Sequence, residues 1–377
     1  MALTAPKGVD MSTPATTISA MALRCHPVGW RTLAPHPAAA CGKLRGRRCD
    51  SWHGVAMLGP SAPAPFDPSG LRLADALRRS GIEPRRGGWV AVRHGVWIGQ
   101  SEWLALDPAR QHAAFVHATM LVCDPDSEHV VSHSSAAAIW GLPRIESWPP
   151  TVHVTTTPGR VRSSARMVRH TARDTPSVQR EGLTVTPVAR TVADVARTST
   201  LATALASADH ALRFGLCTSE ALAAELARVS KGMPGRARLS LAVDLADGRS
   251  MSPGESLSRA QMYRLNVPRP DLQVRYADAQ GLIGDVDFGW DGVVGEFDGR
   301  VKYNVPDGAS SEEASRILWR EKKREDRLRR KVDRVARWTW DVALDHRRLG
   351  AVLAQHGIRT QVRNTWVVSP GLQRRAG

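Results

Sequence analysis

The sequence has few cysteines, and those present form no recognisable framework. Five occur among 377 residues, an odd number, and none belongs to a C-x-x-C pair or has a histidine partner at metal-ligand spacing. Cys25, Cys41 and Cys49 could share a metal ion only if the segment around them folded, and its composition argues against that. We therefore interpret the cysteines as reduced side chains, and a disulfide scaffold or a cysteine zinc site is disfavoured.

Long apolar runs are also missing. No stretch is apolar enough to span a bilayer, and no basic amphipathic helix has a broad aromatic face. The first residues lack a continuous apolar segment behind a basic start, so a secretory signal is not expected. Neither a G-x-S-x-G elbow nor a phosphate-cradling G-x-x-x-x-G-K-[ST] loop occurs. The sequence predicts a cytoplasmic protein with no membrane partner.

What the chain has in excess is positive charge. It contains 52 Lys and Arg against 36 Asp and Glu, a formal net charge of +16, with a sequence pI near 10.7. The hydrophobic fraction of 42% is ordinary for a globular protein, and the length allows two or three domains. A strongly basic protein favours a polyanionic partner through counterion release, so DNA is the expected partner.

The N-terminal part divides into two predicted segments. Residues 1–66 are rich in Ala, Pro, Ser, Gly, Thr and Arg without periodicity, which predicts either disorder or an extension upstream of a true start at Met57. Residues 67–125 begin with a short helix in LRLADALRRSG, followed by a hairpin in GGWVAVRHGVWIG that turns at His94-Gly95. This order indicates a partial winged-helix-like module, or a plain helix on a ribbon, because a complete winged helix needs more helical material.

Residues 126–248 form a predicted mixed α+β middle domain. Helices are expected in SHSSAAAIWGLP, over Val188–Arg197 and over Leu201–Arg228, with strands in TVHVTTT and ARMVRHTA. Five histidines share no helical or strand spacing, so each is interpreted as an ordinary surface or core histidine: His129, His133, His153, His170 and His210.

Residues 249–360 carry the most informative pattern, and residues 361–377 are interpreted as a tail. A helix opens at Ser252, with Pro253 in its first turn and Glu255 three residues after the cap, a capping-box pattern. Three strands, a long basic helix and a fourth strand follow. The predicted order is helix, three strands, helix, strand.

The second and third of these strands form a predicted hairpin around Asp291-Gly292, which would pair Trp290 with Val293. Counting back from this turn places Asp287 opposite Glu296 and Asp285 opposite Asp298. Strand side chains alternate, so the four carboxylates share one face. The other face would hold the apolar side chains Val286, Phe288, Trp290, Val293 and Phe297.

Four clustered carboxylates need a compensating charge. Two opposed negative charges about 5 Å apart repel by about 3 kcal/mol at an effective dielectric near 20. A proton, a basic side chain or a divalent cation would relieve this repulsion, and carboxylate oxygens suit Mg²⁺ or Mn²⁺. The alternative is a solvated acidic face neutralised by Arg300 and Lys302.

The long helix that follows, over about Glu312 to Lys331, is strongly basic. Its place after an acidic sheet favours contact with phosphate groups, although a solvated helix with Glu and Arg four residues apart is the common alternative. The candidate nucleic-acid-binding residues are Arg320, Lys322, Lys323, Arg324 and Arg327.

The motifs SPGES, GDVDFGW, GEFDGRVKY, EKKRED and ARWTW, taken in order over residues 249 to 346, resemble an uncharacterised bacterial domain family. This family is related to the very-short-patch-repair endonucleases of the PD-(D/E)XK, restriction-endonuclease-like superfamily. The resemblance implies an α/β fold with an αβββαβ core.

The same resemblance implies a metal-dependent phosphodiesterase site. Asp287 and Glu296 would bind Mg²⁺ or Mn²⁺, with Asp285 as a further metal ligand, and Glu255 would match the first-helix acid of that superfamily. The metal would stabilise developing charge and activate a water. Where many members have lysine this chain has Asp298, and Lys302, Lys322 or Lys323 could supply the missing cation. No organic cofactor is expected.

Upstream, GGWVAVRHGVWIG, SHSSAAAIWGLP and TPVARTVADVAR are similar to AbiEi-type antitoxins of type IV toxin-antitoxin systems. That resemblance implies an N-terminal winged helix acting on an operator, and a cognate toxin as partner.

The sequence therefore predicts a DNA-binding protein with an endonuclease-like domain, in which Asp287, Glu296 and Asp298 lie at the metal and the basic helix contacts the phosphate backbone. The alternative is a catalytically inactive DNA-binding regulator of the AbiEi kind, which Asp298 in the lysine position favours. A third hypothesis is a module that contacts a protein partner.

Overall fold

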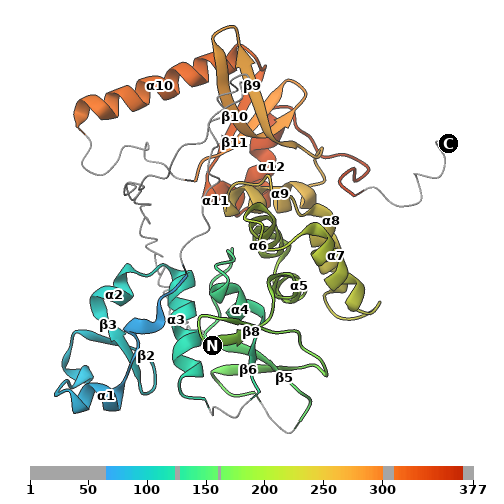
Figure 1. The fold of residues 1–377 in the computed structure, drawn as a ribbon. Coiled ribbons are helices and arrows are strands. Elements are labelled where there is room, and N and C mark those ends of the chain that lie inside the picture. The colour runs from blue at the N-terminus through green and yellow to red at the C-terminus, as the bar shows by residue number, and fades with distance from the viewer. Residues whose placement is uncertain (1–64, 124–127, 160–162, 300–309, 368–377) are drawn as a thin grey trace, which may run out of the picture. The chain divides into compact units, whose positions relative to one another are not determined.

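The computed structural model describes residues 65–123, 128–159, 163–299 and 310–367 (Figure 1). The predicted extension lies outside the described residues up to residue 64, as do Arg300, Lys302 and residues 368–377. The fold is of the mixed α/β class, with three separate sheets. No helix in the described ranges is long and apolar enough to cross a membrane.

The first sheet has three strands in the order β1-β3-β2. The predicted hairpin is confirmed, since β2 (Trp89–Arg93) and β3 (Val96–Gly99) pair antiparallel around His94-Gly95. The short strand β1 (Arg72–Leu73) pairs with β3 and leads into α1 (Ala74–Arg79). The remaining elements of this part are η1 (Pro68–Gly70), η2 (Pro84–Arg86), α2 (Gln100–Ala105) and α3 (Pro108–Met120).

The second sheet is mixed and has the strand order β6-β5-β4-β8-β7. Its strands are β4 (Val130–Val131), β5 (Val152–Thr156), β6 (Met167–Thr171), β7 (Val178–Arg180) and β8 (Leu183–Val185). The helices of this part are α4 (His133–Ile139), α5 (Val188–Thr198), α6 (Leu201–Arg213), α7 (Ser219–Arg228) and α8 (Arg236–Leu245).

The first two parts share a core. Phe66 and Val116 lie in the same buried cluster as Ile139 of α4 and Val154 of β5. The boundary expected between residues 125 and 126 therefore crosses one hydrophobic core, because α3 presents its apolar face to the second sheet.

The third sheet belongs to the C-terminal part and has the order β12-β11-β10-β9. Its elements follow the predicted αβββαβ sequence: α9 (Pro253–Arg264), β9 (Asp271–Asp278), β10 (Gly281–Trp290), β11 (Val293–Phe297), α10 (Ser311–Arg329) and β12 (Arg334–Trp338). The expected pairing of Trp290 with Val293 is confirmed. Strand β12 lies parallel to β11, as a strand, crossover helix and strand unit requires.

The chain closes with α11 (Trp340–Ala343) and α12 (His346–Gln355). The prediction of a tail from residue 361 is wrong for its first residues. Trp366 is 2% exposed, packs in the core with Leu349 and Leu353, and donates its indole N–H to the Val267 carbonyl at 2.7 Å. A buried tryptophan in a segment without periodicity gives no sequence signal.

Candidate functional site

The site begins at the first turn of α9. Ser252 caps the helix, with its hydroxyl accepting the Glu255 N–H at 3.2 Å, as the capping-box pattern predicts. The Glu255 side chain reaches back to the Met251 N–H instead of the cap residue, with Oε2 at 2.8 Å. Glu255 is 5% exposed, so the cap holds a carboxylate inside the protein.

A single amide joins Glu255 to the sheet. Gln273 of β9 donates through Nε2 to Glu255 Oε2 at 3.0 Å and to Asp287 Oδ1 at 3.3 Å. The other Asp287 oxygen accepts the Phe297 N–H of β11 at 2.8 Å. Carboxylates from α9 and β10 are thus held together by one side chain, while Glu255 Oε1 makes no hydrogen bond to the described residues.

The hairpin is less regular than alternation predicts. The ladder between β10 and β11 ends at Phe288 and Gly295, one step before Asp287 and Glu296. Val286 packs with Val294 and Leu328, whereas Phe288 packs in the cluster of Trp338, so the prediction that Val286 and Phe288 share one apolar face is wrong.

The irregularity coincides with Gln273, which has a positive φ of 51° in β9. It lies between Leu272, opposite Phe288, and Val274, opposite Val286. A residue in this conformation interrupts the pleat, and the side chains on either side change face. The interruption is what turns Gln273 toward the two carboxylates.

Two other carboxylates of the predicted acidic face are neutralised by arginines. Asp285 lies on the surface, with Arg275 Nε 2.9 Å from its Oδ1. Glu296 holds two guanidinium groups, Arg324 at 3.0 Å on Oε1 and Arg337 at 2.8 Å on Oε2. Asp298 is exposed, and its backbone N–H donates to the Trp338 carbonyl at 2.8 Å.

The direction of the pKa shifts distinguishes Glu255 and Asp287 from Asp285, another carboxylate of the predicted acidic face. Burial, followed by the neighbouring Asp287, raises the pKa of Glu255 to about 7. Burial also raises the pKa of Asp287, with Glu296 adding to the shift. At Asp285 the hydrogen bonds from Arg275 lower the carboxyl pKa. Glu255 and Asp287 are therefore the carboxylates that would gain most from a bound cation.

Within the described residues, no group of three or more His, Cys, Asp or Glu side chains has the arrangement of a ready-made metal site. The predicted ligand Asp285 and the predicted ligand Glu296 are both occupied by arginine, whereas Glu255 and Asp287 lie together. Lys302, the expected catalytic cation, falls in a segment that is not described.

The candidate nucleic-acid residues of α10 fall into two groups. Arg324 and Arg327 face the sheet, where Arg327 holds Asp278 at 2.6 Å and the carbonyls of Gly281 and Leu282. Arg320, Lys322 and Lys323 are exposed. Lys322 and Lys323 lie 5.9 and 5.4 Å from the ring of Trp319, which is itself 57% exposed.

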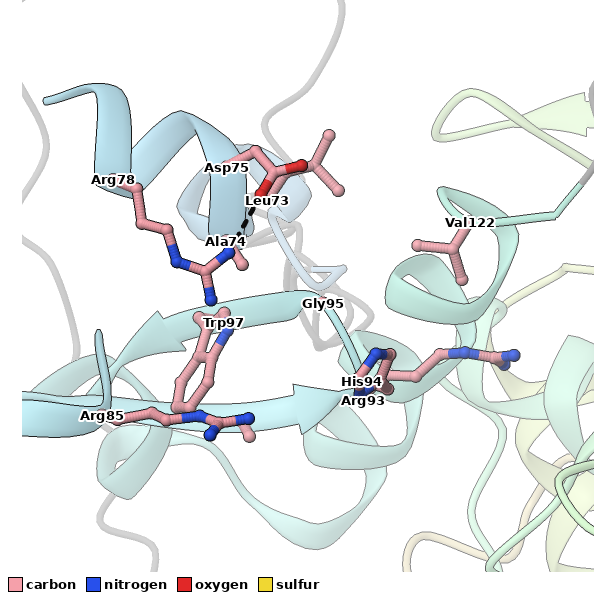
Figure 2. Close-up of a pocket in the computed structure, with 11 residues that line it drawn as sticks. Leu73, Ala74, Asp75, Arg78, Arg85, Arg93, His94, Gly95, Trp97 and Val122 are labelled. Carbon is pink, nitrogen blue, oxygen red and sulfur yellow. Dashed lines mark hydrogen bonds and ion pairs between the residues drawn. The ribbon is translucent and has the colours of Figure 1, made fainter. Parts of the chain in front are cut away.

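Basic side chains gather not only on α10 but also around a cavity beside the first sheet. This cavity has a volume of about 590 Å³. Figure 2 shows Arg78, Arg85 and Trp97 along it, and Arg93 and His94 at the end near Val122. Arg78 already pairs with Asp75 at 3.0 Å, whereas Arg93 Nη1 is buried with no hydrogen-bond partner in the described structure.

Three residues of the acidic site were missed by sequence reasoning. Gln273 gave no signal, since an amide in a strand is commonplace. Arg275 and Arg337 read as ordinary polar positions of their strands, although Arg337 lies beside Glu296 in the parallel register of β11 and β12. No family model matches the chain, and no curated protein matches it.

Proposed function

We propose that the C-terminal domain hydrolyses phosphodiester bonds of DNA in the cytoplasm, using Mg²⁺ or Mn²⁺ held by Glu255 and Asp287. The observation that carries this proposal is the single Gln273 amide that holds these two carboxylates together, Glu255 buried and Asp287 half-buried. Two carboxylates from different elements, held by one side chain and largely away from bulk water, repel each other until a proton or a cation reduces their charge.

The pair fits a hard divalent ion. Mg²⁺ is commonly bound by one or two carboxylates, with water and substrate phosphate completing its octahedron. Glu255 offers a free oxygen, and the raised carboxyl pKa values of Glu255 and Asp287 show that the site favours an added positive charge. When bound, the ion would polarise the phosphate and acidify an attacking water.

The chain's own residues would perform the remaining tasks. Gln273 orients both carboxylates, and the Phe297 N–H fixes Asp287 from the opposite strand. Arg324 and Arg337 share Glu296, and Arg324 also acts electrostatically on Asp287, so these arginines would neutralise charge on a phosphate group. They would supply the positive charge that a lysine provides in many members of the resembled family, where this chain has Asp298.

DNA would be held by the exposed basic residues of α10. Arg320, Lys322 and Lys323 are free of the sheet contacts that occupy Arg324 and Arg327. Trp319 presents an exposed ring beside two lysines, a combination that suits stacking on a base while the ammonium groups contact phosphates.

The test is nicking of supercoiled plasmid with and without Mn²⁺, together with calorimetric titration of Mn²⁺. Asp287→Asn keeps the size of the side chain and should abolish both metal binding and cleavage. Asp285→Asn is the matched control, since its carboxylate is paired with Arg275 and should leave cleavage unchanged. Cleavage that survives in Asp287→Asn, or needs no metal, would refute the proposal.

A second candidate function is an inactive DNA-binding regulator of the antitoxin kind, with operator DNA or a toxin as partner. It is favoured by the two arginines that occupy both oxygens of Glu296, an arrangement that competes with a metal ion. The basic cavity of Figure 2 would then contribute to operator binding. Wild-type protein that binds DNA but never nicks it in Mn²⁺ would favour this function.

A further inference from the structure

Three histidines that share no sequence spacing meet in the second sheet. His133 opens α4, His153 lies in β5 and His170 lies in β6. The rings of His133 and His170 stack with centroids 3.6 Å apart and planes 13° apart, and His153 Nδ1 lies 3.0 Å from His170 Nε2. The sequence, from which each was interpreted as an ordinary surface or core histidine, gives no sign that the three rings meet.

The fold holds His133 in an unusual conformation. Its φ is 54°, in the left-handed region, although the residue is not glycine and is only 7% exposed. The ring is fixed by Ser132, whose hydroxyl lies 3.0 Å from Nδ1 and accepts the Thr155 hydroxyl at 2.9 Å. Strain of this kind persists only where surrounding contacts enforce it, and it concentrates at functional sites.

Two ring nitrogens of the cluster are left without partners. His153 uses both of its nitrogens, with Nδ1 on His170 and Nε2 near the Thr151 hydroxyl at 3.3 Å. Among the described residues, His133 Nε2 and His170 Nδ1 have no hydrogen-bond partner. Two stacked imidazoles thus each present one free nitrogen.

The charges around the cluster are mostly positive. In addition to burial, the charges of Arg190 and Arg197 lower the pKa of His133. Arg197 likewise lowers the pKa of His170, and Arg144 lowers the pKa of His153. The nearest carboxylate is Asp194, 4.0 Å from His133 Nδ1, and Arg190 Nε already donates to both of its oxygens. Burial, His153 and Arg144 also lower the pKa of His112. Burial, with a contribution from Glu225, raises the pKa of Asp194.

The positive charges around the cluster determine which charge a ligand should carry. Burial and the surrounding cations lower the pKa of His133 and His170, so the free rings are neutral. A divalent cation would meet the repulsion of several arginines, whereas an anion would be attracted by them and would favour protonated imidazoles. The described residues, these histidines among them, include no group of three or more His, Cys, Asp or Glu side chains placed to hold a metal ion.

We propose that His133 and His170, close enough to Arg190 and Arg197 to be influenced by their positive charge, bind a phosphate group carrying two negative charges. Such a group has three oxygens that accept hydrogen bonds from ring and guanidinium nitrogens. The source is either inorganic phosphate or the phosphate monoester of a nucleotide. Binding adds protons to the imidazoles, so affinity rises by up to about tenfold per unit fall in pH for each proton taken up, as long as the pH stays above the second phosphate pKa of about 6 and the ligand keeps two negative charges.

The experiment follows the histidine ring signals of the full chain by NMR while inorganic phosphate, or adenosine monophosphate, is added at pH 8 and pH 7, where the monoester keeps two negative charges. We expect the His133 and His170 signals to shift saturably, with binding of adenosine monophosphate tighter at pH 7 by up to about tenfold. His170→Gln should weaken binding about tenfold or more, because hydrogen bonds to a charged group are lost. His346→Gln, in α12, is the matched control and should bind normally.

Tighter binding of the nucleotide would identify a nucleotide phosphate, and tighter binding of inorganic phosphate would identify that ion. Unchanged affinity in His170→Gln, or an affinity for adenosine monophosphate that does not rise between pH 8 and pH 7, would overturn the proposal. Saturable binding of Zn²⁺ to the same rings without any response to phosphate would also overturn it, in favour of a metal site.

Discussion

Arg259 of α9 and Asp209 of α6 form an ion pair of 2.7 Å in which both side chains are only 1% exposed. Asp209 also accepts the Ser256 hydroxyl at 2.7 Å and the Asp247 N–H at 2.8 Å, and Arg259 donates to the Leu245 carbonyl. The pair ties α9, and with it Glu255, to the helices of the middle region. The expected boundary between residues 248 and 249 is therefore crossed by a buried polar network.

Arg259→Met should destabilise the protein by about 3–5 kcal/mol, because it leaves the Asp209 carboxylate buried without its cation. Urea unfolding monitored by tryptophan fluorescence measures the loss. Adding Asp209→Asn should recover part of it, since the amide oxygen can still accept the Asp247 N–H while the unpaired charge is gone.

The matched control for this prediction is Arg78→Met, which removes an exposed pair of similar length with Asp75. That change should cost no more than about 1 kcal/mol. Equal stability losses for the Arg259 and Arg78 variants would mean that burial of the first pair has no energetic consequence.

Gly254→Ala should damage the acidic site without touching a carboxylate. A Cβ at Gly254 would overlap the ring of Phe297, whose backbone N–H fixes Asp287. Overpacking of this kind costs about 1–3 kcal/mol, and the displaced ring should weaken Mn²⁺ binding. Unfolding and Mn²⁺ titration measure the two effects.

Gly99→Ala provides the control for that substitution. Its φ is −57° and an added Cβ would meet nothing closer than 3.9 Å, so stability should change by less than about 0.5 kcal/mol. If Gly254→Ala behaves like Gly99→Ala in both measurements, the close approach of α9 to Phe297 does not support the site.

The order of elements in the C-terminal part could be predicted because its signals are local. Ser252 and Pro253 mark the start of α9, and Asp291-Gly292 marks the hairpin turn, so the pairing of Trp290 with Val293 follows from counting. These residues act on their nearest neighbours in the chain, and no tertiary contact is needed to interpret them.

The composition of the site could be predicted only in part, because its deciding contacts are not local. The interrupted pleat at Gln273 moves Val286 to the other cluster, and strict alternation cannot anticipate it. Arg337 meets Glu296 only once the parallel register of β12 is fixed, and His133 meets His170 only once β6 pairs beside β5.

Replacing both Lys322 and Lys323 with Ala should weaken DNA binding and reduce its salt dependence. If each ammonium group neutralises one phosphate, the slope of log affinity against log salt concentration should fall in magnitude by about 2. Fluorescence anisotropy with labelled duplex at several salt concentrations measures this slope. Lys231→Ala, an exposed lysine after α7, should leave it unchanged. A slope unaffected by the double change would place the DNA contact elsewhere.

Acid should destabilise the region around His112, which is buried between Ser135 and the stacked ring of Trp148. Burial lowers the pKa of His112 from 6.5 to about 4, so below pH 6.5 the unfolded chain binds a proton that the folded chain resists. The stability is complete above pH 6.5 and is lost as the pH falls toward 4, on the order of 2–3 kcal/mol for this residue. Urea midpoints at pH 7, 6, 5 and 4 measure the loss, and His112→Gln should show a shallower dependence on pH because the variant has no proton to take up there. Parallel curves for the two proteins would mean that His112 is protonated as readily in the folded chain as in the unfolded one.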